Sequence, residues 1–205
     1  MSKILKFFNI VPQKNQSWIL WSCFLSCMLN AYVGPMFCKT IISELPPQWI
    51  SFQGCFVCIA SILVGMAWKG KFREKAIKWF MWLALAESFA GFGTGMFLYF
   101  HGWNVWIYAV FSLLYVSIVS LTIGKCVMAF KTKLWNEKSR ELYDNSHSIV
   151  SDLALVIGSV AGMIVVPSLN VALVTWASCC ILDDIGWIIV YMINRKEINE
   201  ARTSE

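Results

Sequence analysis

Long apolar runs separated by short polar segments form the main pattern of this chain. A membrane-spanning helix needs about 20 apolar residues at a rise of about 1.5 Å per residue, and six runs are long enough. We place the spans at residues 17–37, 48–68, 76–100, 104–130, 147–166 and 169–193. The pattern therefore predicts an all-α polytopic membrane protein with a single six-helix domain over residues 1–205.

The breaks between the predicted spans contain helix-breaking or charged residues. Pro46 and Pro47 precede the second span, and Pro167 precedes the sixth. Proline lacks a backbone N–H and clashes with the preceding turn, so it favours helix boundaries. A basic run at 69–78 separates the second and third spans, and a polar stretch at 131–146 separates the fourth and fifth.

The composition supports the membrane assignment. Hydrophobic residues make up 58% of the chain and charged residues 14%, with a mean hydropathy of +0.62. Soluble proteins have about 25% charged residues. The first apolar run, Trp18 to Phe37, is too long for the core of a cleaved signal, so we expect it to remain a transmembrane helix. We expect a multi-pass protein of the cell membrane, in contact with lipid.

Lysine and arginine collect in alternate loops and so predict the orientation. The loops on the other side hold one basic residue, Lys39. Because cytoplasmic loops carry the excess of basic residues, both termini are predicted to be cytoplasmic. The net charge of +5 follows from this asymmetry, so we expect no nucleic-acid partner. The basic residues on the cytoplasmic side are Lys3, Lys6, Lys14, Lys69, Lys71, Arg73, Lys75, Lys78, Lys131, Lys133, Lys138, Arg140, Arg195, Lys196 and Arg202.

The cysteine and histidine patterns predict neither a cofactor nor a metal site. Cys23 with Cys27, and Cys55 with Cys58, share helical faces, but the chain has only two histidines and no paired CxxC loops. Thiols inside a helix bundle usually behave as small apolar groups. No Ser/His/Asp or HExxH arrangement is present, so we expect no enzyme activity.

Glycine-rich segments lie within two of the predicted spans. The run GFGTG at residues 91–95 interrupts an apolar helix and follows no strand, so it does not predict a phosphate loop. Gly158 and Gly162 form a GxxxG motif on the fifth span. Small residues let membrane helices approach closely, so both segments predict tight helix packing.

Polar residues occur near the middle of three spans. Asn30, Glu87 and Asp183 lie roughly 15–20 Å into their spans, counted from one predicted end of each. An ionised carboxylate there costs about 3 kcal/mol, so these groups should face protein or water rather than lipid. A cluster of Glu87 with Asp183 and Asp184 is expected to hold at least one proton. It is either a proton relay or a structural hydrogen bond that joins the third and sixth spans.

Two further expectations follow from helix geometry. Neighbouring helical residues point about 100° apart, so Asp183 and Asp184 are predicted to have different partners. Lys125 and Asp152 each lie about five residues from the cytoplasmic end of their spans, so they are positioned to form an ion pair.

Two stretches resemble the major facilitator superfamily of transporters. GMAWKGKFREK, residues 65–75, is similar to the family's loop signature: Gly65 and Arg73 match it, whereas Lys69 and Phe72 replace its Asp and second Gly. Residues 139–162, SRELYDNSHSIVSDLALVIGSVAG, resemble its passage from the fourth to the fifth helix. Arg140, Gly158 and Gly162 carry this second likeness.

The resemblance implies a fold and a mechanism. Full-length members have two six-helix repeats with a site between them, so this chain would supply one half and work as a homodimer. In that arrangement the first and fourth helices line the cavity, and Glu87 and Asp183 lie behind it. The cavity-facing residues would be Asn30, Tyr108, Ser112, Tyr115, Lys125 and Asp152.

Three functions remain open from the sequence. The first is a half-size transporter of a small organic solute, with protons as the candidate coupling ion. The second is a six-helix binding or accessory subunit of other chains, with Trp103, Trp106 and Tyr108 around a ligand. The third is a membrane assembly or immunity factor that uses residues 131–145 to contact a partner.

Overall fold

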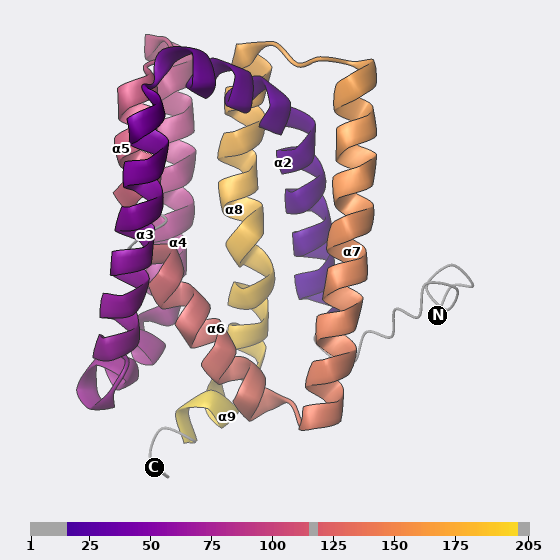
Figure 1. The fold of residues 1–205 in the computed structure, drawn as a ribbon. Coiled ribbons are helices and arrows are strands. Elements are labelled where there is room, and N and C mark those ends of the chain that lie inside the picture. The colour runs from indigo at the N-terminus through magenta and orange to yellow at the C-terminus, as the bar shows by residue number, and fades with distance from the viewer. Residues whose placement is uncertain (1–15, 115–118, 201–205) are drawn as a thin grey trace.

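Helices form the whole regular structure of the described residues. The computed structural model describes residues 16–114 and 119–200 (Figure 1). The predicted all-α class is confirmed there. The helices are α2 (Gln16–Glu44), α3 (Pro47–Ala67), α4 (Gly70–His101), α5 (Val105–Leu114), α6 (Leu121–Leu134), α7 (Glu137–Ile164), α8 (Leu169–Ile193) and α9 (Arg195–Glu200).

Five of these helices, α2, α3, α4, α7 and α8, are long and apolar enough to cross a membrane. They correspond to five of the six predicted spans. The fourth predicted span, 104–130, corresponds to the shorter helices α5 and α6, and residues 115–118 between them are not described. The count of six spans therefore stays a prediction.

The start of α7 differs from the prediction because a cap, rather than hydropathy, begins the helix. We predicted the span from residue 147, but α7 begins at Glu137 in the polar stretch. The side chain of Asn136 accepts a hydrogen bond from the backbone N–H of Ser139 at 2.9 Å. Such a cap satisfies a donor that the first helical turn leaves unpaired.

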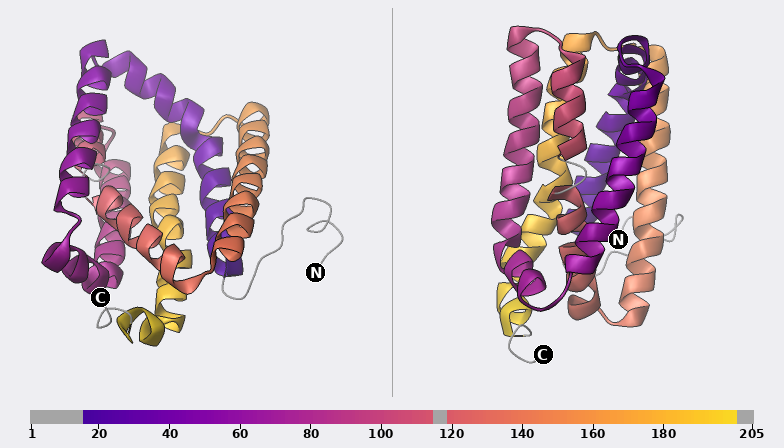
Figure 2. Two further views of the ribbon diagram at one scale, coloured as in Figure 1. Left: turned by 60° about the horizontal axis from the view of Figure 1, so that its bottom comes forward. Right: turned by 60° about the vertical axis from the view of Figure 1, so that its left-hand side comes forward.

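Four helices form a row in the order α7, α2, α8, α4, with α2 packed between α7 and α8, and α8 between α2 and α4. Figures 1 and 2 show α6 crossing obliquely towards the start of α7. The α3–α4 and α6–α7 connections lie at the end of the bundle that also holds the start of α2 and the end of α8 (Figure 1). The basic segments of the described chain therefore share one end, and its cytoplasmic location stays a prediction.

Small residues hold this row together. Lipid tails are as apolar as leucine, so membrane helices associate through close packing rather than hydrophobic burial. A Cβ atom on Gly162 of α7 would lie 2.9 Å from the Tyr32 carbonyl oxygen of α2, and one on Gly95 of α4 would lie 2.7 Å from Cβ of Ala177. The predicted packing role is confirmed at these glycines but is wrong for Gly93, which has open space around it.

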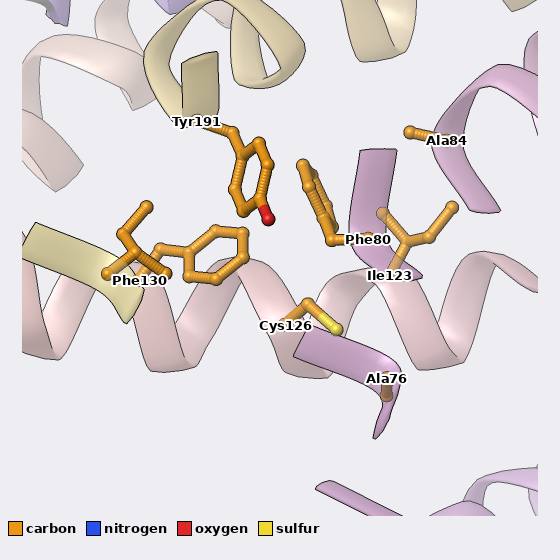
Figure 3. Packing of buried hydrophobic residues seen from close by; sticks show 8 residues of the cluster. Ala76, Phe80, Ala84, Ile123, Cys126, Phe130 and Tyr191 are labelled. Atoms are coloured by element: carbon orange, nitrogen blue, oxygen red, sulfur yellow. The ribbon is translucent and has the colours of Figure 1, made fainter. Parts of the chain in front are cut away.

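An aromatic cluster fixes α6 against the row (Figure 3). Phe80 of α4 meets Phe130 of α6 edge to face, with ring centroids 4.8 Å apart. Tyr191 of α8 lies 5.4 Å from the first ring and 5.6 Å from the second. Three helices thus share one packed centre, which holds α6 in its crossing position.

Candidate functional site

The α8 helix has two different faces. Val174 and Met192 are exposed and apolar, as expected of a surface that meets lipid. Asp183 is nine residues from each of them, so it lies about 180° around the helix from both. Asp183 is nevertheless an exposed residue, and it lies on the side of α8 that faces away from its apolar outer surface.

Aromatic rings cover this inner face above and below Asp183. Trp176 lies on the same face two turns earlier, and its ring is 5.2 Å from Tyr108 and 6.0 Å from Phe111 of α5. Trp187 lies one turn later, 5.9 Å from Trp135 in the α6–α7 connection. Asp183 therefore lies between two aromatic contacts, one from α8 to α5 and one from α8 to the α6–α7 connection.

A chain of hydrogen bonds runs from α2 to Asp183. The Asn30 side-chain amide donates to the Ser26 hydroxyl at 3.3 Å, and this hydroxyl donates to Oδ1 of Asp183. Ser26 is buried, whereas Asn30 is half-buried. Asp183 is ten residues from the end of α8 at Ile193, or about 15 Å along the axis. We call Ser26, Asn30 and Asp183 the central polar group.

Asp184 points to a different helix. Its Oδ2 accepts a hydrogen bond from the Ser88 hydroxyl of α4 at 3.0 Å, and both residues are buried. Glu87, the neighbour of Ser88, is also buried. The prediction that the adjacent aspartates have different partners is confirmed, because Asp183 binds α2 and Asp184 binds α4.

The burial of these acids differs. Asp183 is exposed, whereas Glu87 and Asp184 are buried. The expectation that Glu87 and Asp183 lie behind a cavity-facing surface stays a prediction.

Serine and cysteine side chains extend the polar contacts of α2. The Ser22 hydroxyl donates to the Leu182 carbonyl oxygen and accepts from the Gly186 N–H at 3.3 Å. Cys23 and Cys27 have their sulfur atoms 3.8 Å apart. Cys27 Sγ is also 3.5 Å from the Ser151 hydroxyl of α7.

Sequence reasoning missed these serines. A signal was present on α2, because Ser22, Ser26 and Asn30 follow one another at spacings of four and share a helical face. Ser88 and Ser151 contact partners on other helices, and the spacing of polar residues along their own helices does not reveal these contacts.

The predicted cavity residues of α5 are engaged in packing. Tyr108 stacks on Phe37 of α2 with ring centroids 5.6 Å apart. Ser112 accepts a hydrogen bond from the Gln53 side-chain amide of α3 at 3.3 Å. Tyr115 lies outside the described residues.

Lys125 and Asp152 are not an ion pair in the described part of the chain, and both are exposed. The buried face of α7 passes through Val150 and Ala154, and Asp152 points about 160° away from each. Asp152 was also a candidate for a proton-coupling or buried polar residue; the side chain is exposed rather than buried, and its coupling role stays a prediction. The ion pair that does join α6 and α7 is Lys131 with Asp144, at 2.8 Å.

The residues that carry the loop resemblance lie at one end of the bundle. Gly65 accepts a backbone hydrogen bond from Trp68 at the end of α3, and Arg73 is half-exposed in the first turn of α4. Arg140 lines a cavity of about 240 Å³ between the end of α6 and the start of α7. The other lining residues are Met128, Lys131, Thr132, Glu137, Glu141 and Asp144.

The Ser88–Asp184 contact is predicted to stabilise the α4–α8 pair. A double-mutant cycle with Ser88→Ala and Asp184→Ala should give a coupling free energy of about 1 kcal/mol, as for interhelical hydrogen bonds in membranes. The measurement is the free energy of unfolding in mixed detergent micelles. Ser178→Ala is the control, because the Ser178 hydroxyl bonds to Val174 of its own helix. A coupling near zero for Ser88 with Asp184 would contradict the assignment.

Comparisons with models of known families, with characterised proteins and with solved structures give no match. The resemblance to the major facilitator superfamily therefore stays a prediction. Function has to be argued from the geometry of the central polar group, because a helical fold is compatible with many activities.

Proposed function

We propose that this protein is a small-solute membrane transporter in which the central polar group binds the solute or a coupling cation. The observation that carries the proposal is the exposed Asp183 carboxylate, about 15 Å along α8 from its end, on the side away from the apolar outer surface. Ionisable groups at this depth are costly and commonly mark substrate, ion or proton pathways.

The hydrogen bonds of the group favour a positively charged ligand. Ser26 donates to Oδ1 of Asp183, and Asn30 in turn donates to Ser26. Both donors bond within the group, and a carboxylate with two oxygens keeps further acceptor capacity for a ligand. A carboxylate attracts a cation or a proton and repels an anion.

We also propose that the protein works as a homodimer in the cell membrane. A two-fold axis along the membrane normal would bring two copies of the central polar group together, as the major facilitator resemblance implies. The tight packing of α4 on α8 supports this comparison, because the third and sixth helices form one layer in that family. The apolar stretch of α3 has no buried residue, so its surface is available to lipid or to a second copy of the chain.

The alternative of a six-helix binding subunit has weaker support. It requires a ligand pocket among Trp103, Trp106 and Tyr108. Instead, Trp103 and Tyr108 pack against each other and against the buried ring of Phe37. Trp106 packs edge to face on Trp49. These aromatic residues therefore make helix contacts, which favours the central polar group as the site.

The test is uptake by the purified protein in liposomes, with a panel of small cations and organic amines and with or without a pH gradient. Asp183→Asn should reduce uptake at least about tenfold, because it removes a charge that pairs with the ligand. The expected wild-type result is uptake of at least one solute above that of empty liposomes.

Glu74→Gln is the matched control, because it makes the same chemical change at an exposed residue near the start of α4. It should retain wild-type uptake. Wild-type protein that behaves like empty liposomes across the panel would contradict the transporter proposal. Equal uptake by wild type and Asp183→Asn would contradict the role of Asp183.

A further inference from the structure

The pair Cys23 and Cys27 is the second chemically distinctive group on α2. Both residues are half-buried, and their sulfur atoms are 3.8 Å apart. Two thiolates bound to one tetrahedral Zn²⁺, each at about 2.3 Å, also lie about 3.8 Å apart. The two thiols share a hydrogen bond at this distance, and the same spacing would let both sulfurs bind one metal ion without moving apart.

The surroundings of the pair suit a cation. The Asp183 carboxylate accepts a hydrogen bond from Ser26, the residue next to Cys27 on α2. The Ser151 hydroxyl of α7 lies 3.5 Å from Cys27 Sγ and adds an oxygen donor. A bound cation would thus meet two sulfurs, a hydroxyl and a nearby negative charge.

We propose that Cys23 and Cys27 form a binding site for a thiophilic metal cation beside the central polar group. The inference names a cargo class for the transporter proposed above and rests on that function for the cargo role, whereas the binding site rests on the geometry of the thiols. Binding of one divalent ion breaks two S–H bonds, forms two metal–sulfur bonds and releases two protons to water.

The site is of the open kind. Among the described residues, no group of three or more His, Cys, Asp and Glu side chains is arranged to hold a metal. The protein therefore supplies two strong ligands and leaves the other positions of a tetrahedral ion to water or weaker donors. Closed sites with four protein ligands are structural, whereas open positions permit exchange of ligands, as a transported ion requires.

The second cysteine pair provides a matched comparison. Cys55 and Cys58 lie three residues apart on α3, and both are exposed. They have the same two thiols without the carboxylate of α8 and the hydroxyl of α7 beside them. Non-specific binding to thiols should involve both pairs, whereas the proposed site involves only Cys23 and Cys27.

The test is Cd²⁺ binding to the reduced full chain, purified without a polyhistidine tag. Wild type should bind one high-affinity Cd²⁺ per chain and show the ultraviolet charge-transfer band of thiolate-bound cadmium. Cys23→Ser and Cys27→Ser should each weaken binding at least about tenfold, because each removes a metal ligand. The double variant Cys55→Ser/Cys58→Ser should bind as wild type does. Retention of the band without Cys23 and Cys27, or its loss in both pairs of variants, would overturn the inference.

A second measurement needs no substitution and so does not depend on the folding of variants. Stoichiometric Cd²⁺ should slow the alkylation of Cys23 and Cys27 in wild type at least about tenfold and leave Cys55 and Cys58 unaffected. Equal alkylation rates with and without Cd²⁺ would reject the site.

Uptake into liposomes separates this inference from the proposed function. Binding without uptake of Cd²⁺ or any other solute would keep the metal site and reject transport. Asp183-dependent uptake of other solutes without Cd²⁺ binding would keep the transporter and reject the metal site.

Discussion

Gly158→Leu should prevent stable folding of the bundle. Gly158 of α7 lies against the backbone of α2, where even a Cβ atom would come within 2.9 Å of Ala31 Cβ and of the Met28 carbonyl carbon. Backbone cannot move aside as the end of a flexible side chain can, so the two helices must separate. Overpacking costs about 1–3 kcal/mol and occasionally more, and we expect the upper end or beyond here.

The measurement is the free energy of unfolding in mixed micelles, together with the fraction of protein that elutes as one species. Gly93→Leu is the control, because it makes the same change in α4 at a glycine with nothing within 4 Å. It should stay within about 1 kcal/mol of wild type, since an exposed substitution has small effects. A Gly158→Leu protein as stable as the Gly93→Leu protein would show that α2 and α7 are not in contact as described.

The sequence predicted the helical class and much of the helix packing for physical reasons that can be named. Membrane spans require apolar runs of fixed length, so hydropathy finds them without knowledge of tertiary structure. The Gly158 and Gly162 spacing likewise signals a surface that another helix can approach. The helix α7 begins ten residues before the predicted span, because Asn136 caps it in a polar segment where hydropathy has no signal.

The candidate site was harder to predict, because it depends on which direction each side chain takes in the assembled bundle. The angle between Asp183 and Asp184 follows from any helix, so their separation was predictable. Which of them meets α4 depends on the rotation of α8, and a single sequence does not fix that rotation. For the same reason Lys125 and Asp152 appeared able to pair, although α7 turns Asp152 away from its buried face.

The exposure of Asp183 also predicts a large difference in reactivity between neighbouring positions. A cysteine in Asp183→Cys should react with a water-soluble, charged thiosulfonate, whereas one in Asp184→Cys should react at least about tenfold more slowly, because Asp184 is buried against Ser88. Modification is measured at each site by mass spectrometry of peptides, so the native cysteines can stay in place.

The reactivities of these two variants also show whether water or lipid lies beside position 183. Such a reagent forms adducts with thiolates in water and enters lipid poorly, so modification requires a hydrated path to the inner face of α8. Cys126, which is fully buried, serves as the unreactive internal reference in both variants. Equal, slow modification at positions 183 and 184 would mean that no water reaches the central polar group, and it would then have to act in helix packing alone.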